Sequence, residues 1–224
     1  MNDRATVPER ALVLSYAPAA TRTGLAALLA LDDTLGQILR TTREPLVGQM
    51  RLTWWHDALT ALDAAPPPAQ PVLQALAESV LPRGVSGAQL AAMIDGWEAL
   101  LEAEAIGPAA LAAHAAARGR TMFVAARSLL GGASSDPVEA AGEGWALADL
   151  ARHMRDPEAA RRAAAAASPA IAAATAIRWS RAGRPLGALA HLARMDLAVP
   201  LDTPILRATP RRVARLALHR LTGR

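Results

Sequence analysis

The sequence contains no cysteine and no lysine, and its aromatic residues are limited to five Trp, one Tyr and one Phe. Without cysteine the chain cannot form disulfides, thiolate metal sites or a cysteine nucleophile, which fits a reducing cytoplasm. Aromatic and β-branched residues, which favour strands, are sparse, whereas alanine, the strongest helix former, is abundant. The composition predicts an all-α fold with one domain over residues 1–224.

Long apolar runs are also missing. No stretch reaches the roughly 18 apolar residues of a transmembrane helix, and the first residues, MNDRATVPER, lack the apolar core of a secretory signal. We therefore expect a cytoplasmic protein. The formal net charge is +4 and every basic residue other than histidine is arginine, but no nucleic-acid-binding motif accompanies this charge, so we expect no nucleic-acid partner.

Proline and glycine divide the chain into helical segments joined in a compact bundle. Residues 66–71, PPPAQP, form a stiff connector, and residues 131–137 form a loop. Residues 197–209 form a proline-punctuated linker to a last helix. The expected helices cover about 9–17, 21–41, 45–62, 71–81, 87–105, 108–130, 137–155, a segment from 157, 169–182, 185–196 and 210–221.

The most informative segment is EPLVGQMRLTWW, in which Pro45 suits the first position of a helix. Its pattern, Glu-Pro-x-x-Gly-x-x-Arg-Leu-x-Trp-Trp, resembles the signature helix of the squalene/phytoene synthase family. Weaker similarity extends over about residues 11–160. The resemblance implies the all-α isoprenoid synthase fold. We expect the pair Trp54 and Trp55 to lie in the core.

Active members of that family hold Mg²⁺ with two Asp-rich motifs, each with carboxylates at i and i+4 on one helix face. At the first motif Gly36 and Arg40 stand where the carboxylates belong, and at the second His153 and Pro157 do. The chain has two acidic pairs at i and i+4. We interpret Glu98/Glu102 as part of a solvated face and Glu139/Glu143 as partners of the helix dipole. The sequence therefore predicts no bound metal and no synthase activity.

An alternative remains open, in which an active prenyl-diphosphate synthase uses displaced carboxylates and magnesium. One stripe of a predicted helix carries four polar residues, Asp149, Arg152, His153 and Asp156, which could line a pocket. For metal binding, the simpler interpretation is that these residues pair with one another on a solvated face and hold no metal. The candidate catalytic residues would be Asp32, Asp33, Asp149, His153 and Asp156. Arg152 and Arg51 are the candidates for binding a diphosphate or another anion.

The last segment, PRRVARLALHRLTGR, predicts a basic amphipathic helix over 210–221. Val213, Leu216, Ala217 and Leu221 form an apolar stripe, opposite a basic side of Arg211, Arg212, Arg215 and His219. Such a helix could contact an anionic membrane peripherally or complete the bundle with its arginines in solvent.

Non-catalytic relatives of the family, including a respiratory complex I assembly factor, carry a similar signature helix without intact Asp motifs. This resemblance implies an accessory or assembly protein with a protein partner, in the cytoplasm at the inner membrane face. A metal-free module that binds an isoprenoid lipid is the third hypothesis, because the fold could keep its cavity after losing the metal.

Overall fold

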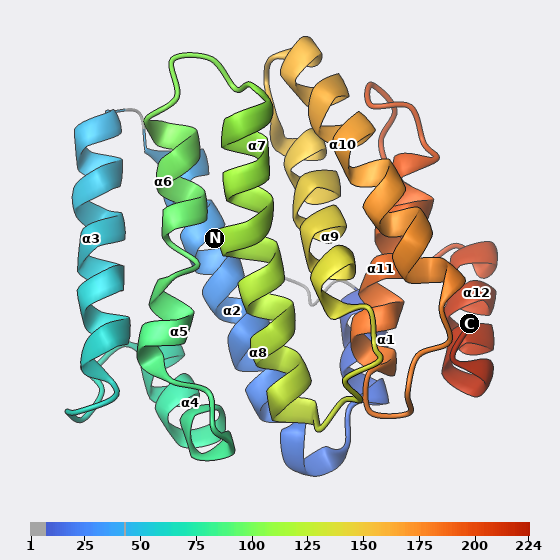
Figure 1. Cartoon of the computed structure of the whole chain (residues 1–224), viewed down its shortest axis with the longest axis horizontal. Helices are drawn as coiled ribbons and strands as arrows, with labels where there is room; N and C mark the ends of the chain where they lie inside the picture. The colour runs from blue at the N-terminus through green and yellow to red at the C-terminus, as the bar shows by residue number, and fades with distance from the viewer. Residues whose placement is uncertain (1–7, 43) are drawn as a thin grey trace.

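The structure, a computed structural model, describes residues 8–42 and 44–224. The expectation about a signal sequence concerns mainly residues 1–7, which lie outside that range. Within it, every regular element is a helix (Figure 1). The elements are α1 (Pro8–Tyr16), α2 (Ala19–Thr41), α3 (Pro45–Ala61), α4 (Pro71–Ser79), η1 (Leu81–Arg83), α5 (Gly87–Ala91), α6 (Asp95–Leu101), α7 (Pro108–His114), η2 (Ala115–Arg120), α8 (Thr121–Leu130), α9 (Val138–His153), α10 (Pro157–Ala176), α11 (Arg184–Leu197) and α12 (Pro210–Thr222).

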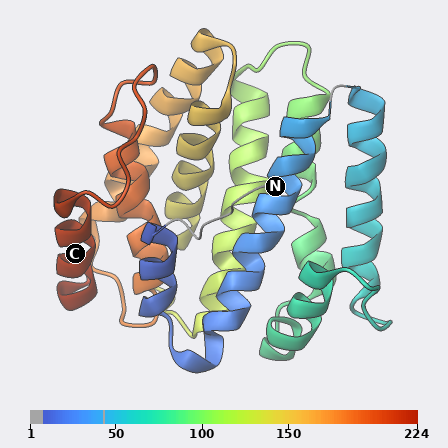
Figure 2. The same cartoon turned by 180° about the vertical axis from the view of Figure 1, so that it is seen from behind.

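The helices stand side by side as a bundle, with α3 at one edge and α12 at the other (Figure 1). Seen from behind, α2 crosses the middle of the bundle and α1 lies near α11 and α12 (Figure 2). Leucines recur on α2 at helical spacing, and Leu25, Leu28 and Leu35 are fully buried in one continuous core that also includes Phe123 of α8. The predicted all-α fold is confirmed.

Glycine allows α9 to lie unusually close to η2. A Cβ on Gly119 would come within 2.2 Å of the carbonyl oxygen of Gly142, and a Cβ on Gly142 within 2.3 Å of that of Gly119. The two backbones therefore touch directly. This contact brings η2 to the side of α9 that faces the centre of the bundle, where the candidate site lies.

Two of the predicted helices have wrong boundaries, and a third has the predicted extent but contains a turn that we did not predict. Residues 87–105 form two short helices with a turn between Ala91 and Asp95. Residues 108–130 are continuous, but η2 within them is a π-helical turn. In contrast, α10 continues through Pro169, where we predicted a separate helix. Ile171 of α10 lies against Gly144 of α9, so close contact with a neighbouring helix outweighs the backbone hydrogen bond lost at proline.

The tryptophan pair of α3 is only half buried, contrary to our expectation. Trp55 is 6% exposed and belongs to the core, whereas Trp54 is 48% exposed. Adjacent residues diverge by about 100° around a helix, so only one of them can face the bundle from this edge position. Leu46, Val47 and Met50 are also exposed, and with Trp54 they make an outward apolar face on α3.

The last helix also differs from its prediction. It buries Arg212, Leu216 and His219, while Val213 and Leu221 of the predicted apolar side are exposed. Arg212 is therefore not part of a solvated arginine face. None of the helices in the described part of the chain is both long enough and apolar enough to cross a bilayer.

Candidate functional site

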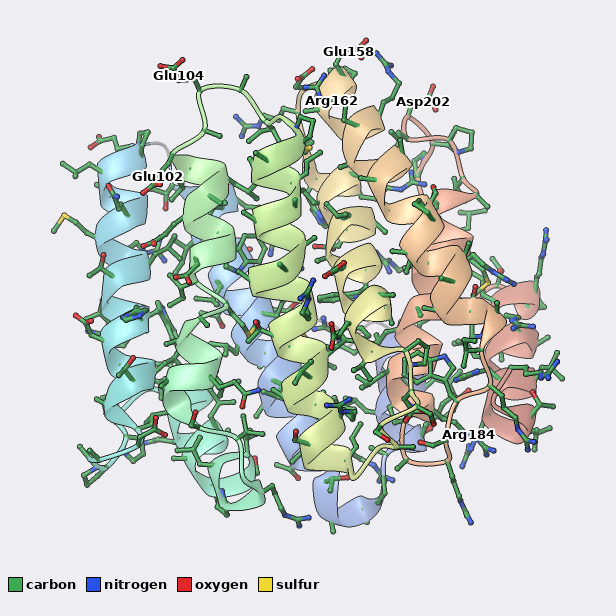
Figure 3. The ribbon with its side chains drawn as sticks, in the orientation of Figure 1. Glu102, Glu104, Glu158, Arg162, Arg184 and Asp202 are labelled. Atoms are coloured by element: carbon green, nitrogen blue, oxygen red, sulfur yellow. The ribbon has the colours of Figure 1, made fainter. Side chains whose placement is uncertain are left out.

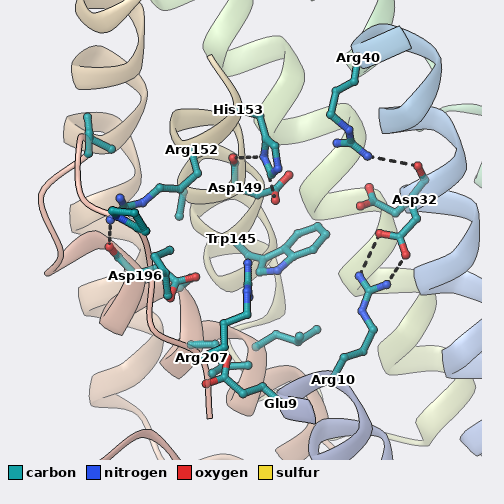
Figure 4. Close-up of a pocket in the computed structure, with 18 of the residues that line it drawn as sticks. Glu9, Arg10, Asp32, Arg40, Trp145, Asp149, Arg152, His153, Asp196 and Arg207 are labelled. Carbon is teal, nitrogen blue, oxygen red and sulfur yellow. Dashed lines mark hydrogen bonds and ion pairs between the residues drawn. The ribbon is translucent and has the colours of Figure 1, made fainter. Parts of the chain in front are cut away.

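A cavity of about 960 Å³ opens between α1, α2, α9, α11 and the linker before α12 (Figure 4). Charged side chains dominate its wall. The lining residues are Glu9, Arg10, Asp32, Asp33, Gln37, Arg40, Arg118, Trp145, Ala148, Asp149, Arg152, His153, Leu189, Leu192, Ala193, Asp196, Leu201, Asp202, Thr203, Pro204, Ile205 and Arg207. The side formed by α1, α2 and α9 is mainly charged. The side formed by α11 and the linker carries most of the apolar members, together with Asp196, Asp202 and Arg207.

At the centre of the charged side, one arginine joins the two candidate carboxylates. Arg118 donates from Nε and Nη2 to the carboxylate of Asp32, at 2.7 and 2.8 Å. Its Nη2 also donates to Oδ2 of Asp149 at 2.7 Å. The side chains of Arg118 and Asp32 are each 3% exposed. The guanidinium therefore occupies the space between a carboxylate of α2 and a carboxylate of α9.

The remaining donors of this guanidinium are also engaged, and two tryptophan rings lie against it. Nη1 donates to Nε2 of His114 at 3.3 Å and to the carbonyl of Ala146 at 3.5 Å. The guanidinium carbon lies 4.3 Å from the ring centre of Trp97 and 4.8 Å from that of Trp145. Every N–H group of Arg118 has an acceptor, so the residue is held in one orientation by hydrogen bonds and aromatic rings.

Local backbone geometry explains how Arg118 reaches this position. It belongs to the π-helical turn η2, and π turns place a side chain differently from the surrounding α-helix. Gly96 of α6 lies directly against this turn, where a Cβ would come within 2.8 Å of the backbone nitrogen of Arg118. Gly119 gives the turn its contact with α9. Glycines on both sides therefore let the arginine enter the core.

The charge of Arg118 shifts the pKa values of its neighbours Asp149 and His114. Burial alone would raise the pKa of Asp149, but the adjacent Arg118, and then His153, outweigh it and hold that pKa below its usual value. Burial, and then the charge of Arg118, lowers the pKa of His114 to about 3. His114 is therefore neutral, with Nδ1–H donating to the carbonyl of Gly96 at 2.6 Å and Nε2 accepting from Arg118.

Magnesium, which the isoprenoid synthase fold implies, does not fit this arrangement. A magnesium ion would need the space between Asp32 and Asp149 and their oxygen lone pairs, and the guanidinium of Arg118 takes both. The rest of the described chain offers no substitute, because no cluster of three or more His, Asp or Glu side chains is suited to a metal there. We derive no reaction step through magnesium.

The other predicted site residues have different surroundings. Asp33 pairs with Arg10 at the cavity wall, and His153 lies there with Nδ1 2.8 Å from the carbonyl of Asp149. Asp156 is outside the cavity and caps the N-terminus of α10 through the amides of Glu158 and Ala159. The stripe predicted on α9 thus lines the cavity except at Asp156.

Of the two arginines predicted to bind a diphosphate, one lines the cavity and the other does not. Arg152 lines the cavity (Figure 4), but it donates to backbone carbonyls of the linker before α12, including that of Pro200 at 2.9 Å. Arg51 does not line the cavity; it is exposed on α3 and donates to Thr42. Two other wall arginines have few contacts: among the described residues Arg207 makes no hydrogen bond, and Arg40 makes one, to the carbonyl of Asp33 at 3.5 Å.

Sequence reasoning missed Arg118, His114 and Trp97. Arg118 is separated from Asp32 by 86 positions and from Asp149 by 31, so no local spacing connects them. A weak signal existed in Gly119, which follows directly after the arginine within a helical segment, because glycine inside a helix often marks close backbone contact.

The fold is that of the isoprenoid synthases. The structure aligns with the crystal structure of a dehydrosqualene synthase in complex with ligand at a TM-score of 0.73, with 13% identity, over 96% of this chain and 91% of that chain. In sequence, the squalene/phytoene synthase family matches residues 4–163, most of the chain. The protein belongs to the squalene/phytoene synthase family. No curated protein matches it in sequence.

The neutral buried histidines make stability sensitive to pH. The pKa of His114 and that of His191 both lie at about 3, mainly because of burial. The unfolded chain binds protons at these rings below about pH 6.5, whereas the folded chain does not until about pH 3. Stability is therefore complete above about pH 6.5 and falls as the pH drops from there towards 3.

Urea unfolding at pH 7, 6 and 5 checks this expectation. For His114 the loss approaches roughly 1.4 kcal/mol per pH unit once the unfolded ring is protonated. His114→Asn, which can still donate towards Gly96, should reduce the slope and leave the part that is due to His191. His56, which is exposed on α3, provides the control, since His56→Asn should leave the slope unchanged. A wild-type unfolding free energy that is constant from pH 7 to 5 contradicts the expectation.

Proposed function

We propose that this protein is a non-catalytic member of its family, an accessory or assembly protein in which Arg118 replaces the metal. The observation that supports this most directly is the guanidinium between Asp32 and Asp149. In a synthase, bound cations neutralise the charge that develops on departing diphosphate and connect it to the protein. An arginine with all its donors engaged by protein groups has none left for a diphosphate.

The outward apolar face of α3 supports the proposal that this protein binds a protein partner. Leu46, Val47, Met50 and Trp54 are 69%, 42%, 66% and 48% exposed and recur at helical spacing. Contiguous exposed apolar side chains are typical of protein–protein contact sites. By the resemblance to the complex I assembly factor branch, the partner would be a subunit of a larger assembly. We place this accessory or assembly role in the cytoplasm, at the inner membrane face.

A second candidate, a metal-free module that binds an isoprenoid lipid, is supported by the cavity itself. Leu189, Leu192 and Leu201 line its apolar side, and Arg40 on the opposite side has donors available for an anion. A prenyl chain and its acidic head group would match these two sides. This activity is compatible with the loss of catalysis, because it needs no metal.

Calorimetry of a non-hydrolysable farnesyl diphosphate analogue, with and without Mg²⁺, separates the candidates. We expect no magnesium-dependent binding. Binding that is equal with and without magnesium and is weakened by Arg40→Ala supports the lipid-binding module, and no binding favours the accessory role. Binding or turnover that requires magnesium contradicts the non-catalytic proposal.

The variant Arg118→Ala tests whether the arginine replaces the metal. Its removal leaves the carboxylates of Asp32 and Asp149 without their cation, and we expect Mg²⁺ to raise the melting temperature of the variant but not that of the wild type. Arg120→Ala is the control, since Arg120 lies two positions away in the same turn and pairs with Glu143 on the surface. Equal responses to Mg²⁺ in wild type and Arg118→Ala would count against replacement.

A further inference from the structure

Helix α12 is attached to the bundle through one apolar residue, Leu216, which is fully buried, and through two polar residues, Arg212 and His219. Arg212, with its side chain only 7% exposed, donates to Glu9 of α1 at 2.5 and 2.9 Å and to Asp196 of α11 at 2.7 Å. His219 lies with Nε2 3.0 Å from the carbonyl of Arg184. These two anchors fix which side of α12 faces the bundle.

The consequence is that α12 presents apolar side chains outward. Val213, Leu218 and Leu221 are 41%, 48% and 77% exposed, and Ala214 and Ala217 between them are exposed as well. These positions follow i, i+1, i+4, i+5 and i+8 and form one stripe along the helix. The helix stands at the outer edge of the bundle, with open space beside it (Figure 1).

Arginine surrounds this stripe, and carboxylates are scarce near it. Neither residues 177–195 nor residues 203–224 contain Asp or Glu. The carboxylates that reach α12 from other elements, Glu9 and Asp196, are both occupied by Arg212. The exposed arginines beside the stripe are therefore not neutralised within these segments; they are Arg178, Arg181, Arg211, Arg220 and Arg224.

A second hollow, of about 430 Å³, lies where α12 ends and α11 begins. It is lined by Tyr16, Arg181, Arg184, Arg220 and Leu221. The guanidinium of Arg220 lies 5.1 Å from the ring centre of Tyr16. Within the described chain, the buried Tyr16 Oη and Arg184 Nε have no hydrogen-bond partner.

The composition of this hollow selects an anion. It combines three arginines and a tyrosine hydroxyl with no carboxylate, and guanidinium groups bind phosphate oxygens in paired hydrogen bonds. Figure 3 labels Arg184 at this end of the bundle. Leu221 belongs both to the hollow and to the apolar stripe, so a phosphate bound there has apolar surface next to it.

We propose that α12 and the adjoining hollow form a docking surface for an anionic phospholipid membrane, with a lipid phosphate in the hollow and the apolar stripe in the interface between head groups and acyl chains. This deepens the placement at a membrane face proposed above and is independent of whether the chain is catalytic. A helix with an apolar side flanked by arginine lies in the plane of an anionic membrane in this manner. The outward apolar face of α3 is less suited to an anionic membrane, because it lacks such a group of arginines and the carboxylate of Asp57 lies near it.

Sedimentation with vesicles tests the proposal on the full chain. We expect binding to vesicles that mix phosphatidylglycerol with phosphatidylcholine and little binding to phosphatidylcholine alone, with affinity falling as salt rises. Arg181→Glu combined with Arg220→Glu should weaken binding by about tenfold or more, because each cation near an anionic surface adds roughly 1 kcal/mol. Leu218→Asp combined with Leu221→Asp should weaken it similarly.

Matched variants on the opposite edge of the bundle provide controls. Arg51→Glu and Leu46→Asp change an exposed arginine and an exposed leucine of α3 and should leave vesicle binding within about twofold of wild type, a range too small for a lost membrane contact. Unchanged melting temperatures would show that every variant is folded.

Three results would overturn the proposal: equal losses in the α3 controls, equal binding to both kinds of vesicle, or binding of inorganic phosphate without binding of vesicles. The last result would assign the hollow to a free anion. None of them bears on the magnesium experiment, so the two proposals fail separately.

Discussion

Replacing Arg118 with methionine is expected to lower the free energy of unfolding by about 3–5 kcal/mol, the usual cost of removing one partner from a buried ion cluster. The loss arises because Asp32, which is almost fully buried, would keep its charge in the core without a counterion, while Asp149, 30% exposed at the cavity wall, would lose its arginine partner. The aromatic contacts of the guanidinium with Trp97 and Trp145 would also be lost. Urea unfolding at pH 7 measures the effect.

Two further variants identify the cause. Arg118→Lys keeps a positive charge but cannot donate to both carboxylates in the same planar arrangement, so an intermediate loss is expected. Combining Arg118→Met with Asp32→Asn and Asp149→Asn removes the uncompensated charge and should recover part of the stability. In the single methionine variant, the pKa of Asp149 should rise, because burial is then no longer outweighed by Arg118.

A loss below about 1 kcal/mol in Arg118→Met would contradict this account, since a surface ion pair contributes no more than that. It would mean that the carboxylates find water or another cation when the arginine is removed. If the triple variant recovers no stability, the loss would come from packing and from the stacking of the guanidinium on the tryptophan rings, and not from uncompensated charge.

Replacing Gly119 with alanine is expected to destabilise the protein by about 3 kcal/mol, at the upper end of overpacking effects. The new Cβ would lie 2.2 Å from a backbone oxygen of Gly142, and backbone cannot turn away as a side chain can. Helix α9 would have to move away from η2. Such a movement would also lengthen the contact between Arg118 and Asp149.

Gly107→Ala is the matched control, because the nearest atom to its Cβ would be 3.9 Å away, an ordinary contact. Its effect should stay within about 0.5 kcal/mol, as for most surface substitutions. Thermal or urea unfolding of the two variants gives the comparison. Equal stability of Gly119→Ala and Gly107→Ala would contradict the direct backbone contact between η2 and α9.

Several features of this protein were predictable because they depend on neighbours in sequence. Alanine content and sparse strand formers predicted helices throughout, and the spacing of the signature segment indicated the family. The positions of Gly36, Arg40, His153 and Pro157 predicted that the carboxylate pairs needed for magnesium are missing. Each of these inferences uses a spacing of a few residues, which helix geometry converts directly into position.

Other features depend on contacts between distant segments and could not be predicted. Which tryptophan of α3 is buried depends on the edge position of that helix, and which side of α12 faces outward depends on Glu9 and Asp196. Helix α10 continues through the exposed Pro169 because the helix packs against α9, where Ile171 meets Gly144. Local propensity is weak beside such contacts, so tertiary structure decided these points.

The sequence by itself determined the helical class and the family, and it predicted that the paired carboxylates are missing, because these inferences need only residue types and short spacings. Only the tertiary structure decided what fills the space between Asp32 and Asp149. A π-helical turn between two close glycine contacts carries Arg118 there from a distant part of the chain. The physical reason is that a buried carboxylate needs a compensating charge, and sequence order does not say which distant cation will supply it.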